Sequence, residues 1–344
     1  MIPRTIERDG ATIRFIDQTL LPERLEVVAC TDVERLATAI RRLEVRGAPA
    51  LGIAGAYGVA LAAMTSTETE YGPFVAEVTE AAAYLRATRP TAVNLGWGID
   101  RTMAALRAAG TADEADEAVE AAVREADLIA SEDEEICRAL GKNGADLIPD
   151  GARVLTHCNA GALACSTWGT ALGIVRSAVE SGKKVTVTAC ETRPLLQGAR
   201  LTAFELHEDG VPVRVITDST AAFLMQRGEI DCVVVGADRI TADAVFNKIG
   251  TYMHAVCARH HGIPFYVAAP VSTFDTGRRA ADVTIEERKG DEIGIFNGRR
   301  TVPAGVPCTN FAFDRTPLDL VSAIVTERGV LRPPYYRMPD TGNI

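Results

Sequence analysis

Five short apolar runs in the second half of the chain place the strongest constraint on its fold. They are RVLTHC (153–158), KVTVTAC (184–190), PVRVITD (212–218), CVVVGAD (232–238) and PFYVAAP (264–270). Helical patterns such as TALGIVRSAVESG separate most of them. Strands buried on both faces read as nearly continuous apolar runs, and their alternation with helices is typical of a parallel sheet. The pattern predicts a Rossmann-like, doubly wound parallel sheet of about five or more strands.

The first part of the chain predicts a smaller domain of strands and helices, which makes the whole an α/β protein. ATIRFID (11–17) and RLEVVAC (24–30) alternate as strands do, on either side of a turn. Amphipathic helical patterns follow as far as IPDGAR (148–153), whose Pro, Asp and Gly are typical of a linker. We therefore expect a strand-and-helix domain over residues 1–148 and a Rossmann-like catalytic domain over residues 149–344.

Charge and composition exclude several classes of function. A net charge of −10 argues against a nucleic-acid or membrane-surface partner that is held by bulk electrostatics. The N-terminus lacks the pattern of a signal peptide, and we find no run of about 18 apolar residues that could span a membrane. The eight cysteines contain no C-x-x-C pair, which disfavours a zinc ribbon, and free thiols suit a reducing compartment. A cytoplasmic protein is expected.

Polar side chains follow the predicted strands at the edge where a parallel sheet binds its ligands. These strand tips carry Cys158, Cys190, Asp218 and Asp238. A thiol and carboxylates on one edge suit a proton-transfer site. The alternative is that Asp and Ser at such junctions cap helices, and we favour that interpretation for Asp218-Ser219-Thr220.

The stretch THCNAGALA (156–164) predicts that Cys158 ends a strand and that a helix begins directly after it. A helix N-terminus lowers the pKa of a thiol, although a free cysteine can equally be a small packed hydrophobe. The neighbouring His157 would point to the opposite face, and we interpret it as structural. Asp238 would be desolvated at the end of an apolar strand, so that its pKa rises and it can donate a proton.

A second group of residues predicts an anion-binding site. RGAPALGIAGAYG (46–58) has glycines three apart, which suits close helix packing as well as a phosphate loop. Its first residues, Arg46, Gly47 and Ala48, nevertheless place a cation and backbone N–H groups at a helix start. The other polar candidates are Arg89, Gln197, Asn247 and Lys248.

Together these residues indicate a small phosphorylated polyol as substrate. We expect Arg46, Arg89 and Lys248 to contact it in a cleft between the two predicted domains. The first strand of the predicted sheet is not followed by G-x-G-x-x-G, which disfavours a dinucleotide site and hence a dehydrogenase.

Eight longer motifs carry a resemblance to a known family. In chain order they are RGAPALGIAGAYG, RPTAVNL, THCNAGALA, ETRPLLQGARLTAFEL, ITDSTAAFLM, VVGADRITADAVFNKIGTY, IEER and ERGVLRPPY. With these motifs the chain resembles the 5-methylthioribose-1-phosphate isomerases of methionine salvage over nearly its whole length. The same superfamily includes ribose-1,5-bisphosphate isomerase and the regulatory subunits of the nucleotide exchange factor of translation initiation.

The resemblance implies a role for each candidate residue. It implies that Cys158 and Asp238 are the catalytic pair. It also implies a homodimer, a Rossmann-like C-terminal domain, and a reaction that needs neither a metal nor an organic cofactor. The substrate contacts that it implies come from Arg46, Gly47, Ala48, Arg89, Gln197, Asn247 and Lys248.

Two departures and three alternatives accompany the resemblance. Cys190 stands where an aspartate is expected before ETRP, and Phe311 stands where the family usually has proline. The alternatives are a 5-deoxyribose-1-phosphate isomerase, a ribose-1,5-bisphosphate isomerase and a non-catalytic regulatory subunit. A second substrate phosphate would call for additional cations, and we can assign none. A binding-only subunit has no need for Cys158 together with Asp238.

Overall fold

The computed structural model describes residues 2–90, 92–110 and 115–335, which form two compact units. The N-terminal unit contains residues 2–138 and 161–169, and the C-terminal unit contains residues 139–160 and 170–335. The chain thus passes from one unit to the other inside its longest helix and again on either side of residues 161–169. The predicted boundary between residues 148 and 149 stays a prediction.

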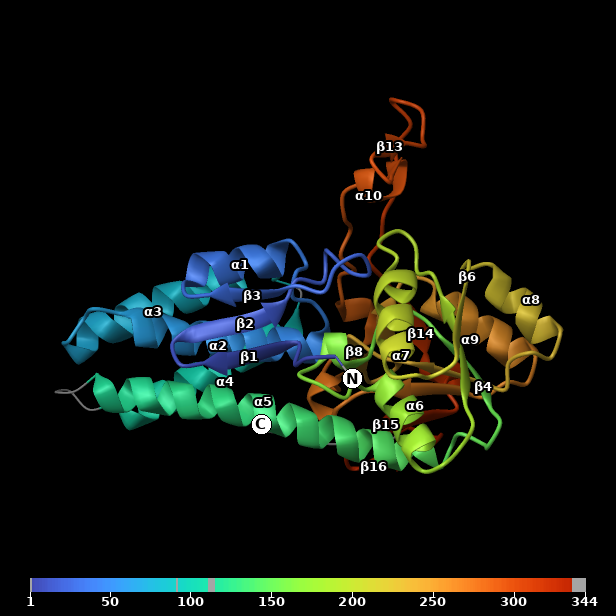
Figure 1. Ribbon diagram of the computed structural model, residues 1–344, viewed down its shortest axis with the longest axis horizontal. Coiled ribbons are helices and arrows are strands. Elements are labelled where there is room, and N and C mark those ends of the chain that lie inside the picture. Colours follow the sequence, from blue (N-terminus) through green and yellow to red (C-terminus); the bar gives the residue numbers. More distant parts are fainter. Residues whose placement is uncertain (1, 91, 111–114, 336–344) are drawn as a thin grey trace. The chain divides into compact units, whose positions relative to one another are not determined.

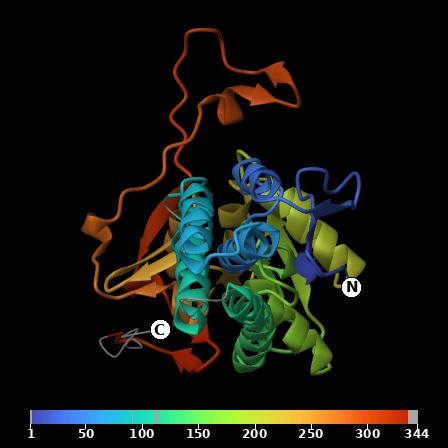
Figure 2. The ribbon, with the colours of Figure 1, turned by 90° about the vertical axis from the view of Figure 1, so that its left-hand side faces the viewer.

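The N-terminal unit combines a small sheet with long helices (Figures 1 and 2). Its antiparallel sheet has the order β1-β2-β3, and the two predicted strands correspond to β2 and β3. Asp32 caps the first helix, because its side chain accepts a hydrogen bond from the backbone N–H of Arg35. The elements are β1 (Ile6–Asp9), β2 (Thr12–Ile16), β3 (Val27–Cys30), α1 (Val33–Arg41), α2 (Ala48–Thr65), α3 (Tyr71–Arg86), α4 (Val93–Ala109) and α5 (Asp116–Ala145), of which the last continues into the C-terminal unit.

Helix α2 forms the core of the N-terminal unit. It is long and apolar enough to meet the length and composition criteria for a membrane span, so the expectation that no such run exists is wrong. Within the protein, however, 78% of it is buried. Its glycines serve close packing: a Cβ added to Gly98 of α4 would lie 2.0 Å from the carbonyl oxygen of Gly52. The glycine spacing therefore reflects a helix–helix contact.

The C-terminal unit contains the predicted parallel sheet, in the order β16-β15-β10-β7-β4-β5-β6 (Figure 1). All five predicted strands are present and pair in parallel, while β16 is antiparallel at one edge. The strands are β4 (Arg153–Thr156), β5 (Thr186–Cys190), β6 (Val213–Ile216), β7 (Cys232–Val235), β10 (Phe265–Ala268), β15 (Ala323–Thr326) and β16 (Gly329–Leu331).

Helices cover both faces of this sheet, which confirms the doubly wound fold. Alternate strand residues face opposite cores: Leu155 packs in one cluster with α8 and α9, whereas Val154 packs in another with α6 and α7. The helices are α6 (Ala171–Glu180), α7 (Ala203–Glu208), α8 (Thr220–Gln226) and α9 (Thr251–His260).

A second sheet, which the sequence did not predict, follows β7. It has the order β11-β8-β9-β14, with β8 (Arg239–Thr241), β9 (Ala244–Lys248), β11 (Phe274–Asp275) and β14 (Phe313–Pro317). Asp238 is therefore followed by a strand, whereas other strands of the parallel sheet are followed by helices. Between β11 and β14 the chain extends away from the rest of the C-terminal unit in both views, and it carries α10 (Asp291–Gly294), β12 (Ile295–Phe296) and β13 (Arg299–Arg300).

The contact between α2 and α4 predicts a difference between two glycine substitutions. Gly98→Ala would drive a methyl group into the backbone of α2, whereas Gly72→Ala at the exposed start of α3 meets nothing within 4 Å. Overpacking outweighs the gain in helix propensity, so we expect Gly98→Ala to lower the free energy of unfolding by about 2 kcal/mol. Gly72→Ala should leave it unchanged or raise it. Urea denaturation measures both, and equal stability of the two variants would contradict the close contact.

Candidate active site

The loop after β4 differs from the prediction. The chain after Cys158 forms only a 3₁₀ turn, η1 (Ala162–Ala164), and helix α6 begins at Ala171, so the helix predicted directly after Cys158 is wrong. The reason lies in the N-terminal unit, where Thr5 Oγ1 and Gln18 Nε2 donate hydrogen bonds to the carbonyl oxygens of Ala162 and Leu163. These tertiary bonds outweigh the helix propensity of the alanine-rich stretch.

The backbone of Cys158 is fixed from both sides. Its N–H donates to Thr192 Oγ1 at 2.9 Å, and its carbonyl oxygen accepts from Thr202 Oγ1 at 2.7 Å. Cys158 has a φ of 64°, and Thr192 has a φ of 66°. Such values are uncommon outside glycine, so the surrounding contacts hold both residues in place. The thiol lies on a partly exposed residue.

The carboxylate of Asp218 holds the turn that contacts Cys158. Its two oxygens accept hydrogen bonds from the backbone N–H groups of Thr192 and Arg193, at 2.7 Å and 2.8 Å. The predicted capping stretch Asp218-Ser219-Thr220 does lie at the start of α8, and Ser219 is the N-cap residue, although its side chain makes no capping hydrogen bond. Asp218 itself does not cap the helix. Asp218 and Thr192 fix the backbone around Cys158, which the sequence did not predict, although the position of Asp218 at a strand end was a signal.

His157 is buried, as expected for a structural residue. Its Nε2 lies 2.8 Å from the carbonyl oxygen of Ile249, which can only accept, so Nε2 carries the proton. Nδ1 then accepts from Nε2 of His254 at 3.2 Å. Burial lowers the pKa of His157 to about 4 and that of His254 to about 3, so both rings are uncharged near neutral pH.

Asp238 lies at the same sheet edge as Cys158. It follows β7, which pairs in parallel with β4 through Leu155 and Val233, so both residues come after the carboxyl ends of neighbouring strands. A Cβ added to Gly236 would lie 2.6 Å from Cβ of Ala160, which shows that the segments leading from Cys158 and to Asp238 touch. The backbone N–H of Asp238 donates to the carbonyl oxygen of Phe246.

Three further candidates in the C-terminal unit lie near this edge. Asn247 is buried and donates to Thr251 Oγ1 at 3.0 Å, while Lys248 Nζ donates to the carbonyl oxygen of Ala312 at 3.0 Å. Gln197 is also buried, and its Oε1 has no hydrogen-bond partner within the described part of the chain. A buried acceptor without a partner is rare, and a substrate hydroxyl would satisfy it.

The other candidates belong to the N-terminal unit. Gly47 precedes α2 with a φ of 98°, and a Cβ there would lie 2.5 Å from Cα of Ala164, so only glycine fits. Ala48 is the first residue of α2, whose N-terminus lacks a side-chain cap, and Arg46 lies just before it. Arg89 lies in the turn between α3 and α4, where its carbonyl oxygen accepts from the N–H of Ala92. Backbone N–H groups at such a helix start can bind an anion.

A buried ion network supports the loop after β4. Arg176 of α6 pairs with Glu205 and Asp209, at 2.7 Å and 2.5 Å. Glu205 in turn accepts from Nδ2 of Asn159, the residue after Cys158. The paired charges tie the loop after β4 to α6 and α7.

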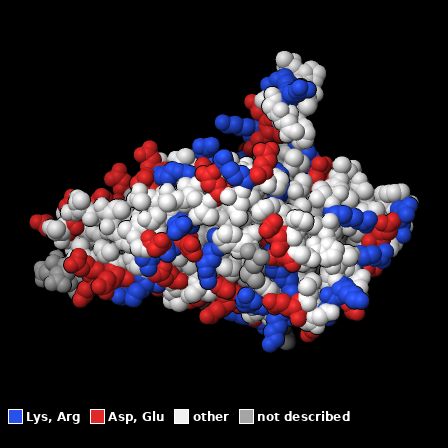
Figure 3. Space-filling view, in the orientation of Figure 1, with Lys and Arg blue, Asp and Glu red and all other residues white. Residues whose placement is uncertain are grey.

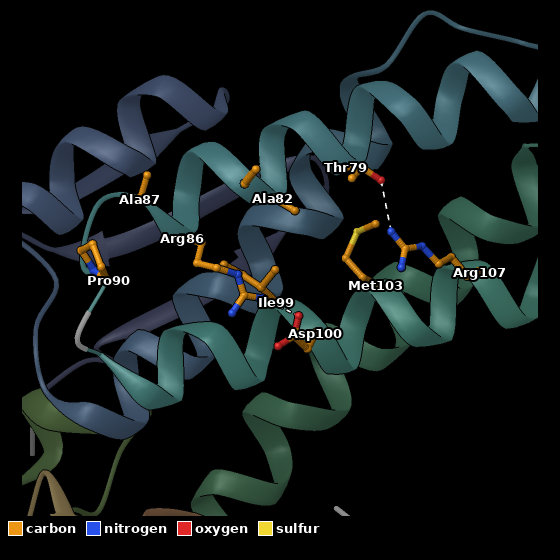
Figure 4. A pocket seen from close by; sticks show the side chains of 10 residues that line it. Thr79, Ala82, Arg86, Ala87, Pro90, Ile99, Asp100, Met103 and Arg107 are labelled. Atoms are coloured by element: carbon orange, nitrogen blue, oxygen red, sulfur yellow. Dashed lines mark hydrogen bonds and ion pairs between the residues drawn. The ribbon is translucent and has the colours of Figure 1, made fainter. Parts of the chain in front are cut away.

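A pocket in the N-terminal unit contains none of the candidate residues. It measures about 470 Å³ and lies between α3 and α4 (Figure 4). Its cations already have partners: Arg86 pairs with Asp100, and Arg107 Nη2 donates to Thr79 Oγ1 at 3.3 Å. Basic and acidic side chains intermingle over the face shown in Figure 3, with no extended basic field that would suit a nucleic acid.

Comparisons with known proteins confirm the resemblance. A relative from Archaeoglobus fulgidus named putative methylthioribose-1-phosphate isomerase is 56% identical over 94% of this chain and 94% of its own length. One from Moorella thermoacetica named 5-deoxyribose 1-phosphate isomerase is 52% identical over 95% of this chain and 93% of its own length. The solved 5-methylthioribose 1-phosphate isomerase of Pyrococcus horikoshii matches with a TM-score of 0.91 and 44% identity, over 98% of this chain and 94% of that chain.

A family model described as the Initiation factor 2 subunit family matches residues 44–333. This match covers most of the chain, and the relatives align over nearly its whole length. The chain belongs to the Initiation factor 2 subunit family.

Proposed function

We propose that this protein is an aldose–ketose isomerase that converts 5-methylthioribose 1-phosphate into 5-methylthioribulose 1-phosphate in methionine salvage. The observation that carries the proposal is the position of Cys158 and Asp238, after the carboxyl ends of the paired strands β4 and β7. The names of the similar proteins supply the reaction class and the substrate. A regulatory subunit of the same family would not need this pair.

The chemistry follows from the substrate. A phosphate on the anomeric oxygen prevents spontaneous opening of the ring, so the enzyme must break the bond between C1 and the ring oxygen. Asp238 donates a proton to the ring oxygen, and Cys158 as thiolate then removes the C2 proton to give an enol phosphate. Cys158 returns that proton to C1, and the C2 hydroxyl returns its proton to Asp238, which leaves a ketone at C2. Each proton transfer of this kind contributes roughly 10²–10⁴-fold to the rate.

Substrate binding is proposed for the remaining candidates. The start of α2, with Arg46, Gly47 and Ala48, suits an anion, and Arg89 and Lys248 add positive charge. Gln197 and Asn247 offer buried amide groups to the sugar hydroxyls. Because all eight cysteines are free thiols, we also propose the cytoplasm as the compartment.

The relative named for 5-deoxyribose 1-phosphate supports a second candidate substrate. We expect kcat/KM to be highest on 5-methylthioribose 1-phosphate. A pocket for the methylthio group should favour it over 5-deoxyribose 1-phosphate by about 10- to 200-fold. Ribose 1,5-bisphosphate should be the poorest of the three.

Steady-state assays on the three sugars, with one enzyme preparation, measure this preference. A higher kcat/KM on 5-deoxyribose 1-phosphate would identify that sugar, and not 5-methylthioribose 1-phosphate, as the preferred substrate. Turnover of none of the three would overturn the isomerase and favour a regulatory subunit.

We propose in addition that the protein is a homodimer. Helix α9 exposes Tyr252, Met253 and Val256, whose side chains are 46%, 41% and 42% accessible, and exposed apolar groups of this size often mark interfaces. Sedimentation at micromolar concentration should give about twice the chain mass of 36.7 kDa. Val256→Glu should shift the equilibrium toward the monomer. A monomer at all concentrations would contradict the proposal.

A further inference from the structure

Four polar side chains are gathered behind Cys158, and the proposed mechanism uses none of them as an acid, a base or a substrate contact. His157 follows β4, Cys190 ends β5, Asp218 follows β6, and His254 lies on α9. His157, Cys190 and His254 are at most 1% exposed, and their nearest nitrogen and sulfur atoms all lie within 4.8 Å of one another. Asp218 Oδ1 lies 3.8 Å from His157 Nδ1, and its charge also acts on Cys190 and His254.

The hydrogen bonds around the cluster orient its side chains in the way that outer hydrogen bonds orient the ligands of a metal ion. His157 donates its Nε2 proton to the carbonyl oxygen of Ile249, which leaves the lone pair of Nδ1 directed at His254. Histidines that bind metals almost always make such a bond with the nitrogen that does not coordinate. The Asp218 carboxylate is fixed by the two backbone N–H groups that it accepts from.

The distances suit a small tetrahedral ion. Zinc binds nitrogen at about 2.0–2.1 Å and sulfur at about 2.3 Å, so tetrahedral ligand atoms lie about 3.3–3.6 Å apart. The two histidine nitrogens are already 3.2 Å apart, and Asp218 Oδ1 is 3.8 Å from His157 Nδ1. Cys190 Sγ lies within 4.8 Å of both histidine nitrogens, whereas Asp218 lies outside this mutual distance and would have to move toward Cys190 and His254 when the ion binds. One thiolate, one carboxylate and two neutral imidazoles would also balance the charge of a divalent ion in a buried site.

We propose that His157, Cys190, Asp218 and His254 bind one zinc ion in a buried structural site. On binding, Cys190 releases its proton to solvent and coordinates as thiolate, while His254 carries its proton on Nδ1. A sulfur, two nitrogens and a carboxylate favour zinc over the harder ions magnesium and calcium. The ligands come from four separate segments, so no short sequence motif predicts the site. The proposal departs from the cofactor-free chemistry that the family resemblance implies.

The ion would tie together the segments that support the catalytic loop. It would join the ends of β4 and β5 to the start of α8 and to α9. It would not take part in proton transfer, because its ligands are the four side chains of the cluster, and the proposed acid and base, Asp238 and Cys158, are not among them. Zinc should therefore raise the unfolding temperature.

Metal content of the full-length protein tests the site independently of activity. Protein expressed with added zinc, freed of loose metal by gel filtration, should contain about one zinc per chain by mass spectrometry. Cys190→Ala should contain less than about a fifth of that amount. His254→Gln should lose zinc likewise while keeping a donor toward His157, which preserves the test if Cys190→Ala fails to fold.

Cys232→Ala is the matched control, because Cys232 is an equally buried thiol on β7 outside the cluster. It should keep the zinc. Refolding with cobalt should give a thiolate-to-cobalt absorption band in the wild type and in Cys232→Ala but not in Cys190→Ala. Wild-type protein without zinc, or full zinc and the cobalt band in Cys190→Ala, would overturn the proposal.

Discussion

The conformation of the loop around Cys158 depends on the hydrogen bonds from the backbone of Thr192 and Arg193 to the Asp218 carboxylate. Thr192 and Cys158 both adopt left-handed backbone conformations, which cost about 1–3 kcal/mol each. Hydrogen bonds to a charged group contribute about 1.5–3 kcal/mol each, which is enough to offset that strain. Because Thr192 accepts from the N–H of Cys158, the carboxylate fixes the cysteine through one intermediate residue.

The strand order of the parallel sheet brings the segment before Asp238 next to the segment after Cys158. Strands β4 and β7 are neighbours in a parallel sheet, so the loops at their carboxyl ends meet, and the contact of Gly236 with Ala160 shows how closely. After β7 the chain turns into the β8–β9 hairpin, where a helix follows other strands. This hairpin returns Asn247 and Lys248 toward the edge that Asp238 has just left. After β7, a pair of strands with polar side chains therefore stands where a helix follows the other strands, at the sheet edge where such folds bind ligands.

The sequence predicted the parts of the fold that depend on local burial. Four of the five apolar runs became parallel strands that are covered on both faces, and a local run of apolar residues is enough to predict such a strand. The fifth, β6, lies at the edge of the sheet and is partly exposed. The prediction failed where residues distant in the sequence determine the local conformation. The alanine-rich stretch after Cys158 is not helical because Thr5 and Gln18, far away in the chain, bond its carbonyl oxygens. Asp218 is a residue type that often caps helices, but it accepts hydrogen bonds from backbone groups of another loop, and no local sequence pattern predicts that contact.

The central claim is that Cys158 moves the C2 proton after Asp238 has opened the ring. Hydrogen–deuterium exchange at C2 of the bound substrate, followed by NMR in heavy water, tests it most directly. We expect Cys158→Ser to bind substrate but to lose exchange and about 10²–10⁴-fold in kcat, and Asp238→Asn to lose ring opening. Cys232→Ser, which alters a buried thiol outside the site, should behave as the wild type. Near-normal kcat and exchange in Cys158→Ser would show that the thiol only packs, and would contradict the mechanism.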